Sequence, residues 1–430
     1  MDGIEGIRSV QGSVWIGMDI HKKNSVVTAF NGAGDELGQW QFRTTSKEIG
    51  NFTKNLPKDT KIALEASTTG KAVFHRLRNA GLDVHMASPR ELKAITSSDV
   101  KTDKRDSYHL GNLLRNNYFP ECYVPPMEIE RVRDLVRFRM GLGQQVTVIK
   151  NQIHALVSKN LLDSEMDEYS DWFGKAGLVR LAGLPISDDD RVILQSYLEQ
   201  LALLISQEEN ASCELAGIGN DNTDVKLLMT IPGIDFYGAL GILGEVGDIH
   251  RFDDKKKLYS YAGLVPKADN SGEMQSKHRR VKRGNRVLKY FLCCAVYGAL
   301  RAKKPNAVAS FYRKKSKQIG SGKAQVAAAR KLSGIVWKIL ITGEPYSEED
   351  PALSGRKIAK MGVKAKISRV IPTDQGLIEL AEAIGSKEDV LNRMLPMDFS
   401  FDRTPSPEGV APLTPSGSGR KNNRRIRDKI

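Results

Sequence analysis

Two aspartates three residues apart, Asp103 and Asp106, lie in the stretch TDKRDSYHLGNLL. Residues three apart share one face of a helix, so two like charges would lie side by side there. Three interpretations are open: acids that stabilise a helix N-terminus, a solvated cluster with the neighbouring cations, or half of a metal site. Because the same helical face continues through the leucines that must pack on a core, we expect both carboxylates to point inward.

Two further acids interrupt apolar strands. Asp19 follows VWIGM and Glu65 follows KIAL. Strand alternation places Asp19 on one face with Trp15 and Gly17. A carboxylate on a buried face costs several kcal/mol unless it is paired, hydrogen-bonded or bound to a metal. The alternative for each acid is a strand end that reaches solvent.

Four acids from two strands and one helix end would converge at one edge of a sheet. Four oxygen ligands match a hard cation such as Mg²⁺, and two such ions suit phosphodiester chemistry. The sequence therefore predicts a metal-binding and catalytic tetrad that consists of Asp19, Glu65, Asp103 and Asp106. The neighbouring cations that suit a nucleic-acid backbone are Lys22, Lys23, Lys101, Lys104 and Arg105.

A second candidate for chemistry is the segment KADNSGEMQSKHRRVKRGNRVLKYF, which carries Ser271 beside Gly272 and then a dense cationic run. A serine beside a glycine is most often a turn residue, and a charged run is often a solvated face. The density of charge before an apolar helix, from about Val287, favours phosphate contact instead. The cations predicted to bind nucleic acid here are Lys277, Arg279, Arg280, Lys282, Arg283 and Arg286.

A tight turn in LLMTIPGIDFYGAL separates two helical runs. This pattern is similar to a helix–hairpin–helix, in which a glycine turn and the following helix N-terminus offer backbone N–H groups to a phosphate. Gly233 is therefore a candidate nucleic-acid contact, although many packed helices share a Pro-Gly turn.

The elements that must position the acids have a recognisable order. Runs rich in β-branched and aromatic residues at 13–20, 25–31 and 37–45 predict three strands, of which the first two suit a hairpin. Helix, strand, helix, strand and helix patterns follow. This order predicts an α/β RNase-H/RuvC-like domain over residues 1–124.

The rest of the chain is predicted to be mainly helical. Residues 125–225 suggest two long helices of a coiled-coil dimerisation arm, with a helical subdomain packed on the same body as the alternative. Residues 226–345 suggest a compact helical domain interrupted by the basic loop. Residues 346–430 suggest a small helical unit followed by a Pro/Ser/Gly-rich, basic tail that we expect to be disordered.

Composition limits the setting and the partners. The chain has 430 residues, a net charge of +14 and a pI near 9.4, which favours a polyanionic partner. The apolar runs are shorter than the roughly 20 residues of a membrane span, and the N-terminus does not match a signal peptide. The four cysteines have no C-x-x-C spacing, so we expect neither structural zinc nor disulfides. This cysteine usage is typical of a protein in a reducing cytoplasm.

Seven motifs occur together in order: GMDIHK, ALEAST, DVKTDKRDS, IPGI…GDIHRF, YAGLVP, NSG and KRGNRVLK. Over residues 13–342 the sequence resembles the DEDD transposases of the insertion-sequence 110 group, which are bridge-RNA-guided serine recombinases. The resemblance implies a Mg²⁺-binding tetrad at the four acids and a serine nucleophile at Ser271. Ser276, nearby in the same loop, is the second choice for the nucleophile. The extension after about residue 346 matches no motif of the family.

The resemblance also implies partners and a place in the cell. It implies donor and target DNA, a structured noncoding bridge RNA that pairs with both, and homodimers that assemble into a homotetramer. It implies a covalent phosphoserine–DNA intermediate and a bacterial cytoplasmic protein associated with the nucleoid.

Two other functions fit the same residues. A Holliday-junction-type endonuclease would use the metal-bound acids and water, without Ser271 as nucleophile. A non-catalytic nucleic-acid-binding scaffold would use the acids only for capping and pairing. A sugar-kinase-like ATPase is disfavoured, because His21, Lys22 and Lys23 leave no small residues after Asp19 to admit a phosphate.

Overall fold

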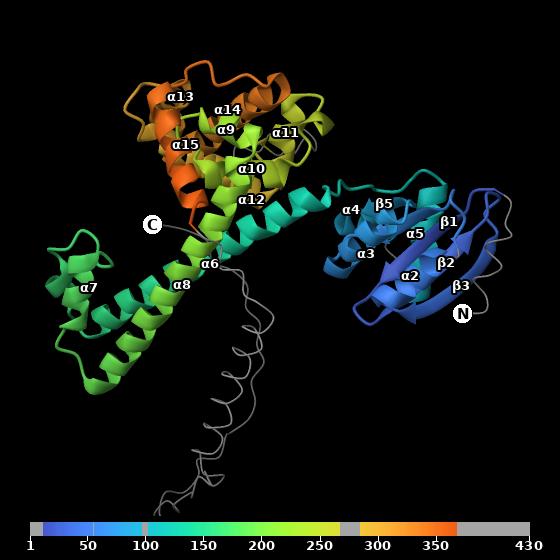
Figure 1. Cartoon of the computed structure of the whole chain (residues 1–430), viewed down its shortest axis with the longest axis horizontal. Coiled ribbons are helices and arrows are strands. Elements are labelled where there is room, and N and C mark those ends of the chain that lie inside the picture. The colour runs from blue at the N-terminus through green and yellow to red at the C-terminus, as the bar shows by residue number, and fades with distance from the viewer. Residues whose placement is uncertain (1–11, 55, 97–101, 267–283, 368–430) are drawn as a thin grey trace, which may run out of the picture. The chain divides into compact units, whose positions relative to one another are not determined.

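The computed structural model describes residues 12–54, 56–96, 102–266 and 284–367 (Figure 1). Several residues predicted to act in the site lie outside this part of the chain: Lys101, Ser271, Ser276, Lys277, Arg279, Arg280, Lys282 and Arg283. The helical unit and the tail expected after residue 370 also lie outside the described residues.

The N-terminal region forms one five-stranded sheet in the order β3-β2-β1-β4-β5. The strands are β1 (Trp15–Ile20), β2 (Asn24–Phe30), β3 (Glu36–Arg43), β4 (Lys61–Glu65) and β5 (Asp83–Ala87). β2 pairs with β1 and β3 in antiparallel fashion, whereas β4 pairs with β1 and β5 in parallel. This mixed sheet with its helices confirms the predicted RNase-H-like domain.

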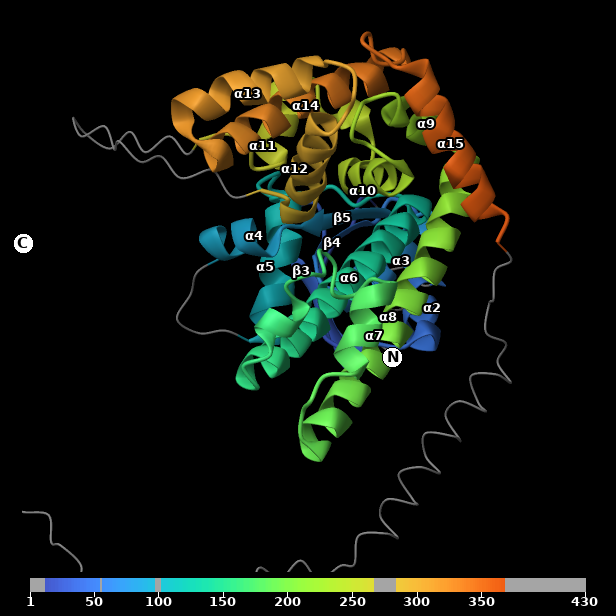
Figure 2. The ribbon, with the colours of Figure 1, turned by 90° about the vertical axis from the view of Figure 1, so that its left-hand side faces the viewer.

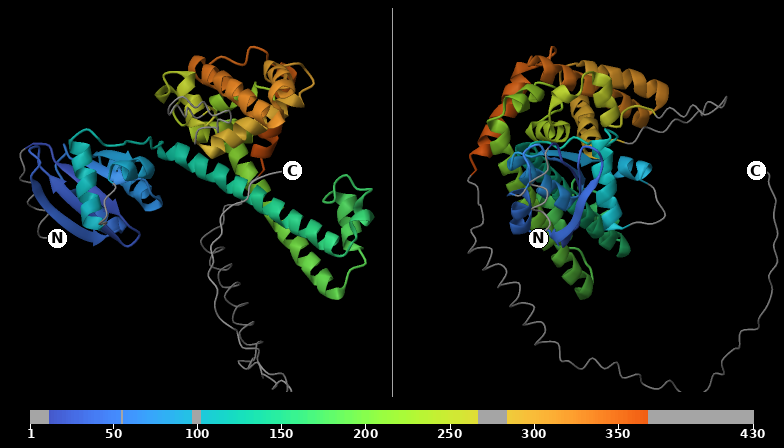
Figure 3. Two further views of the ribbon diagram at one scale, coloured as in Figure 1. Left: turned by 180° about the vertical axis from the view of Figure 1, so that it is seen from behind. Right: turned by 90° about the vertical axis from the view of Figure 1, so that its right-hand side faces the viewer.

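Helices cover both faces of the sheet, so the central strand is buried on each side. The helices are α2 (Ser46–Lys54), α3 (Thr68–Asn79), α4 (Pro89–Ile95) and α5 (Asp103–Arg115). Ile16 and Met18 of β1 pack in one core with Phe52 of α2 and Leu77 of α3. On the opposite face, α5 lies across the strands (Figure 3), where Leu110 packs with residues of β4 and β5.

Two glycines let α5 approach the central strand closely. A Cβ atom at Gly17 would lie 1.9 Å from the carbonyl oxygen of Ser107, and one at Gly111 would lie 2.9 Å from the amide nitrogen of Gly17. The buried hydroxyls of Ser107 and Thr28 are hydrogen-bonded at 2.7 Å. These contacts fix α5 on β1 and β2, and with it the first helical turn, which begins at Asp103.

The remainder of the described chain is helical, as predicted. Its elements are α6 (Met127–Lys159), η1 (Asp163–Met166), α7 (Lys175–Ala182), α8 (Asp188–Asn220), α9 (Thr223–Met229), α10 (Phe236–Val246), η2 (Ile249–Arg251), α11 (Lys255–Tyr261), α12 (Arg286–Leu300), α13 (Ala307–Ile319), α14 (Ser321–Thr342) and α15 (Pro351–Ala365). None of the described helices is both long and apolar enough to cross a membrane.

The two 33-residue helices α6 and α8 pack along one another (Figures 1 and 2). With α7 and η1 they enclose a core that includes Ile153, Leu181 and Leu194. The predicted long helices are therefore present. Their role as a coiled-coil dimerisation arm stays a prediction.

The largest core lies in the C-terminal domain and draws on helices from beyond the predicted segment. Val136 of α6, Leu215 of α8 and Met361 of α15 are buried in it together with residues of α9 to α14. The sequence did not predict α15 as part of this domain. Because α15 packs against this core, the folded C-terminal domain continues past residue 345.

We expect Gly17→Ala to destabilise the protein by roughly 2–3 kcal/mol or to displace α5, because the new Cβ overlaps backbone that cannot rotate away. Gly50→Ala is the matched control. Its Cβ would meet nothing within 4 Å, and alanine is the better helix former inside α2. Urea unfolding of both variants measures the difference. Equal stability of the two variants would contradict the close contact between α5 and β1.

Candidate active site

Asp19 is the penultimate residue of the central strand β1 and is 8% exposed. Burial raises the pKa of its carboxyl above the usual value, and the nearby carboxylates of Asp106 and Asp103 act in the same direction. His21 opposes them by charge and by a hydrogen bond. Asp19 is therefore a desolvated carboxylate among like charges, an arrangement that strongly favours a bound cation.

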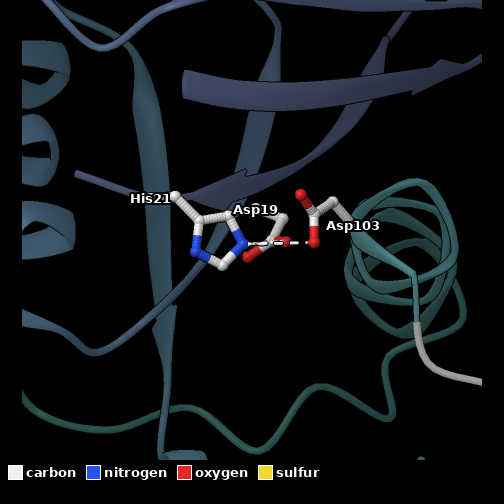
Figure 4. A group of neighbouring side chains, drawn as sticks. All are labelled: Asp19, His21 and Asp103. Carbon is white, nitrogen blue, oxygen red and sulfur yellow. Dashed lines mark hydrogen bonds and ion pairs between the residues drawn. The ribbon is translucent and has the colours of Figure 1, made fainter. Parts of the chain in front are cut away.

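One ring nitrogen of His21 contacts two of the acids (Figure 4). Its Nε2 atom is 3.0 Å from Asp19 Oδ2 and 3.3 Å from Asp103 Oδ1. In the metal-free site Nε2 donates when these carboxylates are ionised, whereas only the tautomer without that hydrogen can bind a metal through Nε2. Asp19, His21 and Asp103 each offer one ligand atom, and these atoms lie within 4.8 Å of one another. Three residues from a strand end and a helix start thus share one small volume.

His21 is not among the site residues predicted from the sequence. The available signal is its position two residues after Asp19, since strand periodicity places residues two apart on the same face. What obscured it was the interpretation of residues 21–24 as a hairpin connection between strands.

The first turn of α5 carries Asp103 and Asp106 but is capped by another residue. Thr102 is the N-cap, and its side chain accepts a hydrogen bond from the Arg105 amide. Neither aspartate is needed for capping. The expectation that both point inward is wrong for Asp103, whose side chain is 59% exposed, because the helix begins there, one turn before its contact with β1. Asp106 is partly buried.

Glu65 ends β4 at the same edge of the sheet as Asp19. The parallel register pairs Met18 with Leu64, so Asp19 and Glu65 are the next residues on neighbouring strands. Ala63 packs under α5, which places Glu65 on the α5 face by alternation. The cluster of ligand atoms within 4.8 Å includes neither Glu65 nor Asp106. The four-acid site therefore stays a prediction.

The cations predicted around the acids are exposed where the structure describes them. Lys22 and Lys23 follow β1, and Lys104 and Arg105 lie in the first turn of α5. Gln39 of β3 donates a hydrogen bond to the carbonyl oxygen of Lys104. Positive charge thus surrounds the carboxylate cluster at the surface.

The second candidate segment, with Ser271, lies outside the described residues, but its two flanks meet. The Asn285 amide donates to the carbonyl oxygen of Tyr261 at 2.7 Å. A Cβ atom at Gly284 would lie 2.3 Å from the amide nitrogen of Gly263. Asn285 then caps α12, because its side-chain oxygen accepts from the amides of the first turn. The described residues on the two sides of this segment are therefore in direct contact.

A buried carboxylate, that of Glu245, stabilises the contact between these two flanks. Glu245 of α10 is 1% exposed and accepts two hydrogen bonds from Arg137, at 2.7 and 2.9 Å, and one from the Asn285 side chain at 2.6 Å. Burial alone would raise the pKa of Glu245, but hydrogen bonds from Arg137 and Asn285 outweigh it and hold the pKa below its usual value. The hydrogen bonds of Glu245 thus outweigh its burial, whereas the His21 hydrogen bond of Asp19 does not.

The turn between α9 and α10 contains Gly233 at a φ of 89°. A Cβ there would lie 2.3 Å from the Ala295 carbonyl oxygen, so packing against α12 by itself requires glycine. Lys357 of α15 donates to the carbonyl oxygens of Ile231 and Ile234, and Asp235 caps α10. A phosphate contact at Gly233 stays a prediction that these contacts do not support. Arg286, by contrast, is exposed at the start of α12.

Two family models match the chain. A transposase model of the DEDD type of IS110 matches residues 16–160, which include the acids, and a model of the IS116/IS110/IS902 transposase family matches residues 225–313. The chain belongs to the IS110 family of DEDD transposases. It is therefore an enzyme that acts on DNA.

Curated relatives of this transposase agree with the family models. A putative transposase, y4qE, of Sinorhizobium fredii is 26% identical over 65% of this chain and 70% of its own length. The transposase for insertion sequence element IS1111A of Coxiella burnetii is 22% identical over 66% of this chain and 79% of its own length. The transposase for insertion sequence element IS1328 of Yersinia enterocolitica is 22% identical over 77% of this chain and 98% of its own length.

We expect Glu245→Gln to lower the free energy of unfolding by about 2 kcal/mol, because it removes a charge that buried hydrogen bonds stabilise. Since the folded-state pKa is lowered, this stabilisation is complete above the unfolded value of about 4.5 and is lost as the pH falls through the folded value. Urea unfolding at pH 7 and pH 4 measures it. Asp253→Asn, in an exposed pair with Lys257, is the control and should change little. A loss independent of pH would contradict the stated cause.

Proposed function

We propose that this transposase cuts donor and target DNA and rejoins them through a covalent bond between Ser271 and a DNA phosphate. A structured noncoding RNA that pairs with both DNAs would select the sites. The proposed catalytic metal is Mg²⁺, and its ligands would be Asp19, Glu65, Asp103 and Asp106. The observation that supports this most directly is the gathering of carboxylates around buried Asp19 at one edge of an RNase-H-like sheet.

The residues present suit a divalent cation. Carboxylate oxygens are the ligands that Mg²⁺ prefers, and mutual repulsion with burial already disfavours the charged form of Asp19. Mg²⁺ bound there would polarise the scissile phosphate and stabilise charge on the leaving oxygen. The exposed cations Lys22, Lys104 and Arg105 would neutralise the flanking phosphates.

The serine step conserves the phosphodiester. The Ser271 Oγ–P bond forms as the bond from phosphorus to the leaving DNA oxygen breaks; the serine hydroxyl loses a proton and the leaving oxygen gains one. A hydroxyl of the partner strand then attacks the phosphoserine, the Oγ–P bond breaks, and the serine regains a proton. Glu245 and Asn285 would act as positioning residues, since they hold the point at which the Ser271 segment rejoins the domain.

Assembly into homodimers and a homotetramer fits the surface of the α6 and α8 pair. Phe138 and Val148 on α6, and Val192 and Leu203 on α8, are exposed large apolar side chains. Two copies that packed along these helices would cover these side chains. The pair is the proposed dimerisation element.

A test of the nucleophile separates this reaction from hydrolysis by a Holliday-junction-type endonuclease. With Mg²⁺, guide RNA and labelled DNA, we expect a denaturant-resistant protein–DNA adduct for the wild type, none for Ser271→Ala, and an undiminished adduct for Ser276→Ala. Asp19→Asn should lower both cleavage and adduct by about 100-fold or more, as for loss of a principal electrostatic group. Continued cutting by Ser271→Ala would favour the endonuclease. Full recombination by Asp19→Asn would favour the scaffold.

A metal titration tests the site apart from activity. We expect Mg²⁺ or Mn²⁺ to raise the melting temperature of the wild type and to leave Asp19→Asn unchanged. In a chelator, Asp19→Asn should melt at the same or a higher temperature, because the desolvated carboxylate destabilises the metal-free fold. An equal metal-dependent rise in both proteins would place the metal elsewhere.

A further inference from the structure

A long acid-free stretch gives one part of the C-terminal domain a strong positive charge. From Gly284 to Gly343 the sequence holds thirteen Lys and Arg residues and no Asp or Glu. Eight of the thirteen lie on α13 and α14, which pack side by side (Figure 2). Within the described residues, Lys304 alone among the thirteen has an ion pair, with Asp350. Uncompensated charge of this density favours a polyanion.

A cavity of about 670 Å³ lies among α11, α13 and α14. Leu264, Phe311 and Val326 form apolar parts of its wall. The remaining wall includes cationic side chains, of which Lys323 and Arg330 are exposed. An apolar floor with a cationic rim suits a ligand that carries both a flat apolar group and negative charge.

Two aromatic rings in the cavity wall are each paired with a cation. The Arg330 guanidinium lies 5.0 Å from the ring centre of Tyr259, and the Lys331 ammonium lies 5.3 Å from that of Phe311. The Tyr259 ring rests against α14, where a Cβ at Gly334 would lie 2.4 Å from its hydroxyl. Aromatic faces beside cations are how proteins hold unstacked bases of single strands.

We propose that this cavity binds single-stranded polynucleotide, with one unstacked base against Tyr259 and Phe311. Phosphates on either side of that base would contact Lys323, Arg330 and Lys331. The described residues that line this cavity include none of the proposed catalytic residues, and α14 lies beyond the segments that the family models match. The shared chemistry, a base on a phosphate backbone, comes from either RNA or displaced DNA.

Binding of four probes tests the cavity in the full-length Ser271→Ala protein, so that the result does not depend on the proposed nucleophile. The probes are a 12-nucleotide oligothymidylate, an abasic strand of equal length and charge, an oligouridylate and a DNA duplex. We expect the base-containing single strands to bind about tenfold tighter than the abasic strand. Phe311→Leu should abolish this preference and leave abasic binding unchanged. If the oligouridylate binds more tightly than the oligothymidylate, the natural ligand is RNA; if the oligothymidylate binds more tightly, it is displaced DNA.

The charged rim has its own variant and control. Arg330→Gln should weaken all strands and reduce the salt dependence of single-strand binding by about 0.7 in slope. Lys360→Gln, at an exposed residue of α15, changes the charge equally and should have little effect. A strand carrying 5-iodouracil should crosslink to a peptide that contains Tyr259 or Phe311.

Three results would overturn the proposal. They are equal binding of abasic and base-containing strands by the parent protein, equal losses for Arg330→Gln and Lys360→Gln, and equally tight binding of an acidic peptide of the same charge. Because Phe311 also packs on the core, its variant must melt as the parent does. If the Phe311 variant melts at a lower temperature than the parent, the proposal is judged by the crosslink and by Arg330→Gln, since Arg330 is exposed.

Discussion

The close contact between α5 and the central strand is the constraint on which the candidate active site depends. Gly17 and Gly111 allow a helix to lie directly on a strand at a distance that side chains forbid. The hydrogen bond between Ser107 and Thr28 then fixes how far along the sheet the helix lies. One turn before that point, the helix begins with Asp103, within reach of His21 and Asp19. A packing contact between backbones thus determines the spacing of charged side chains.

Two buried carboxylates in this protein have opposite surroundings. Glu245 is enclosed by hydrogen bonds from Arg137 and Asn285, which keep it ionised and make it a structural anchor. Asp19 has one histidine and two further acids nearby, and its pKa is raised. A fold tolerates such a poorly compensated carboxylate at a functional site, because a bound ligand, here the proposed cation, stabilises it. The contrast is the physical reason to assign chemistry to Asp19 and support to Glu245.

Positive charge is also distributed unevenly. Around the acids it is interleaved with carboxylates, as a site that holds both phosphate and metal requires. Along α13 and α14 no acid interrupts it, and aromatic rings lie beside the cations. The mixed charge around the acids suits catalysis at a phosphate, and the acid-free charge along α13 and α14 suits binding of a single strand. A transposase that handles several strands at once has use for both.

Strand and helix periodicity in the sequence determined the order of the elements, the mixed sheet and the strand ends that carry Asp19 and Glu65, because local patterns set which residues face a core. The tertiary structure decided which of these residues meet. It added His21 to the cluster, exposed Asp103, and drew α15 into a core that also contains Val136 and Leu215, more than 100 residues earlier in the chain. The Glu245–Arg137 pair likewise joins residues 108 positions apart. Such contacts depend on how helices pack, and no local pattern encodes that.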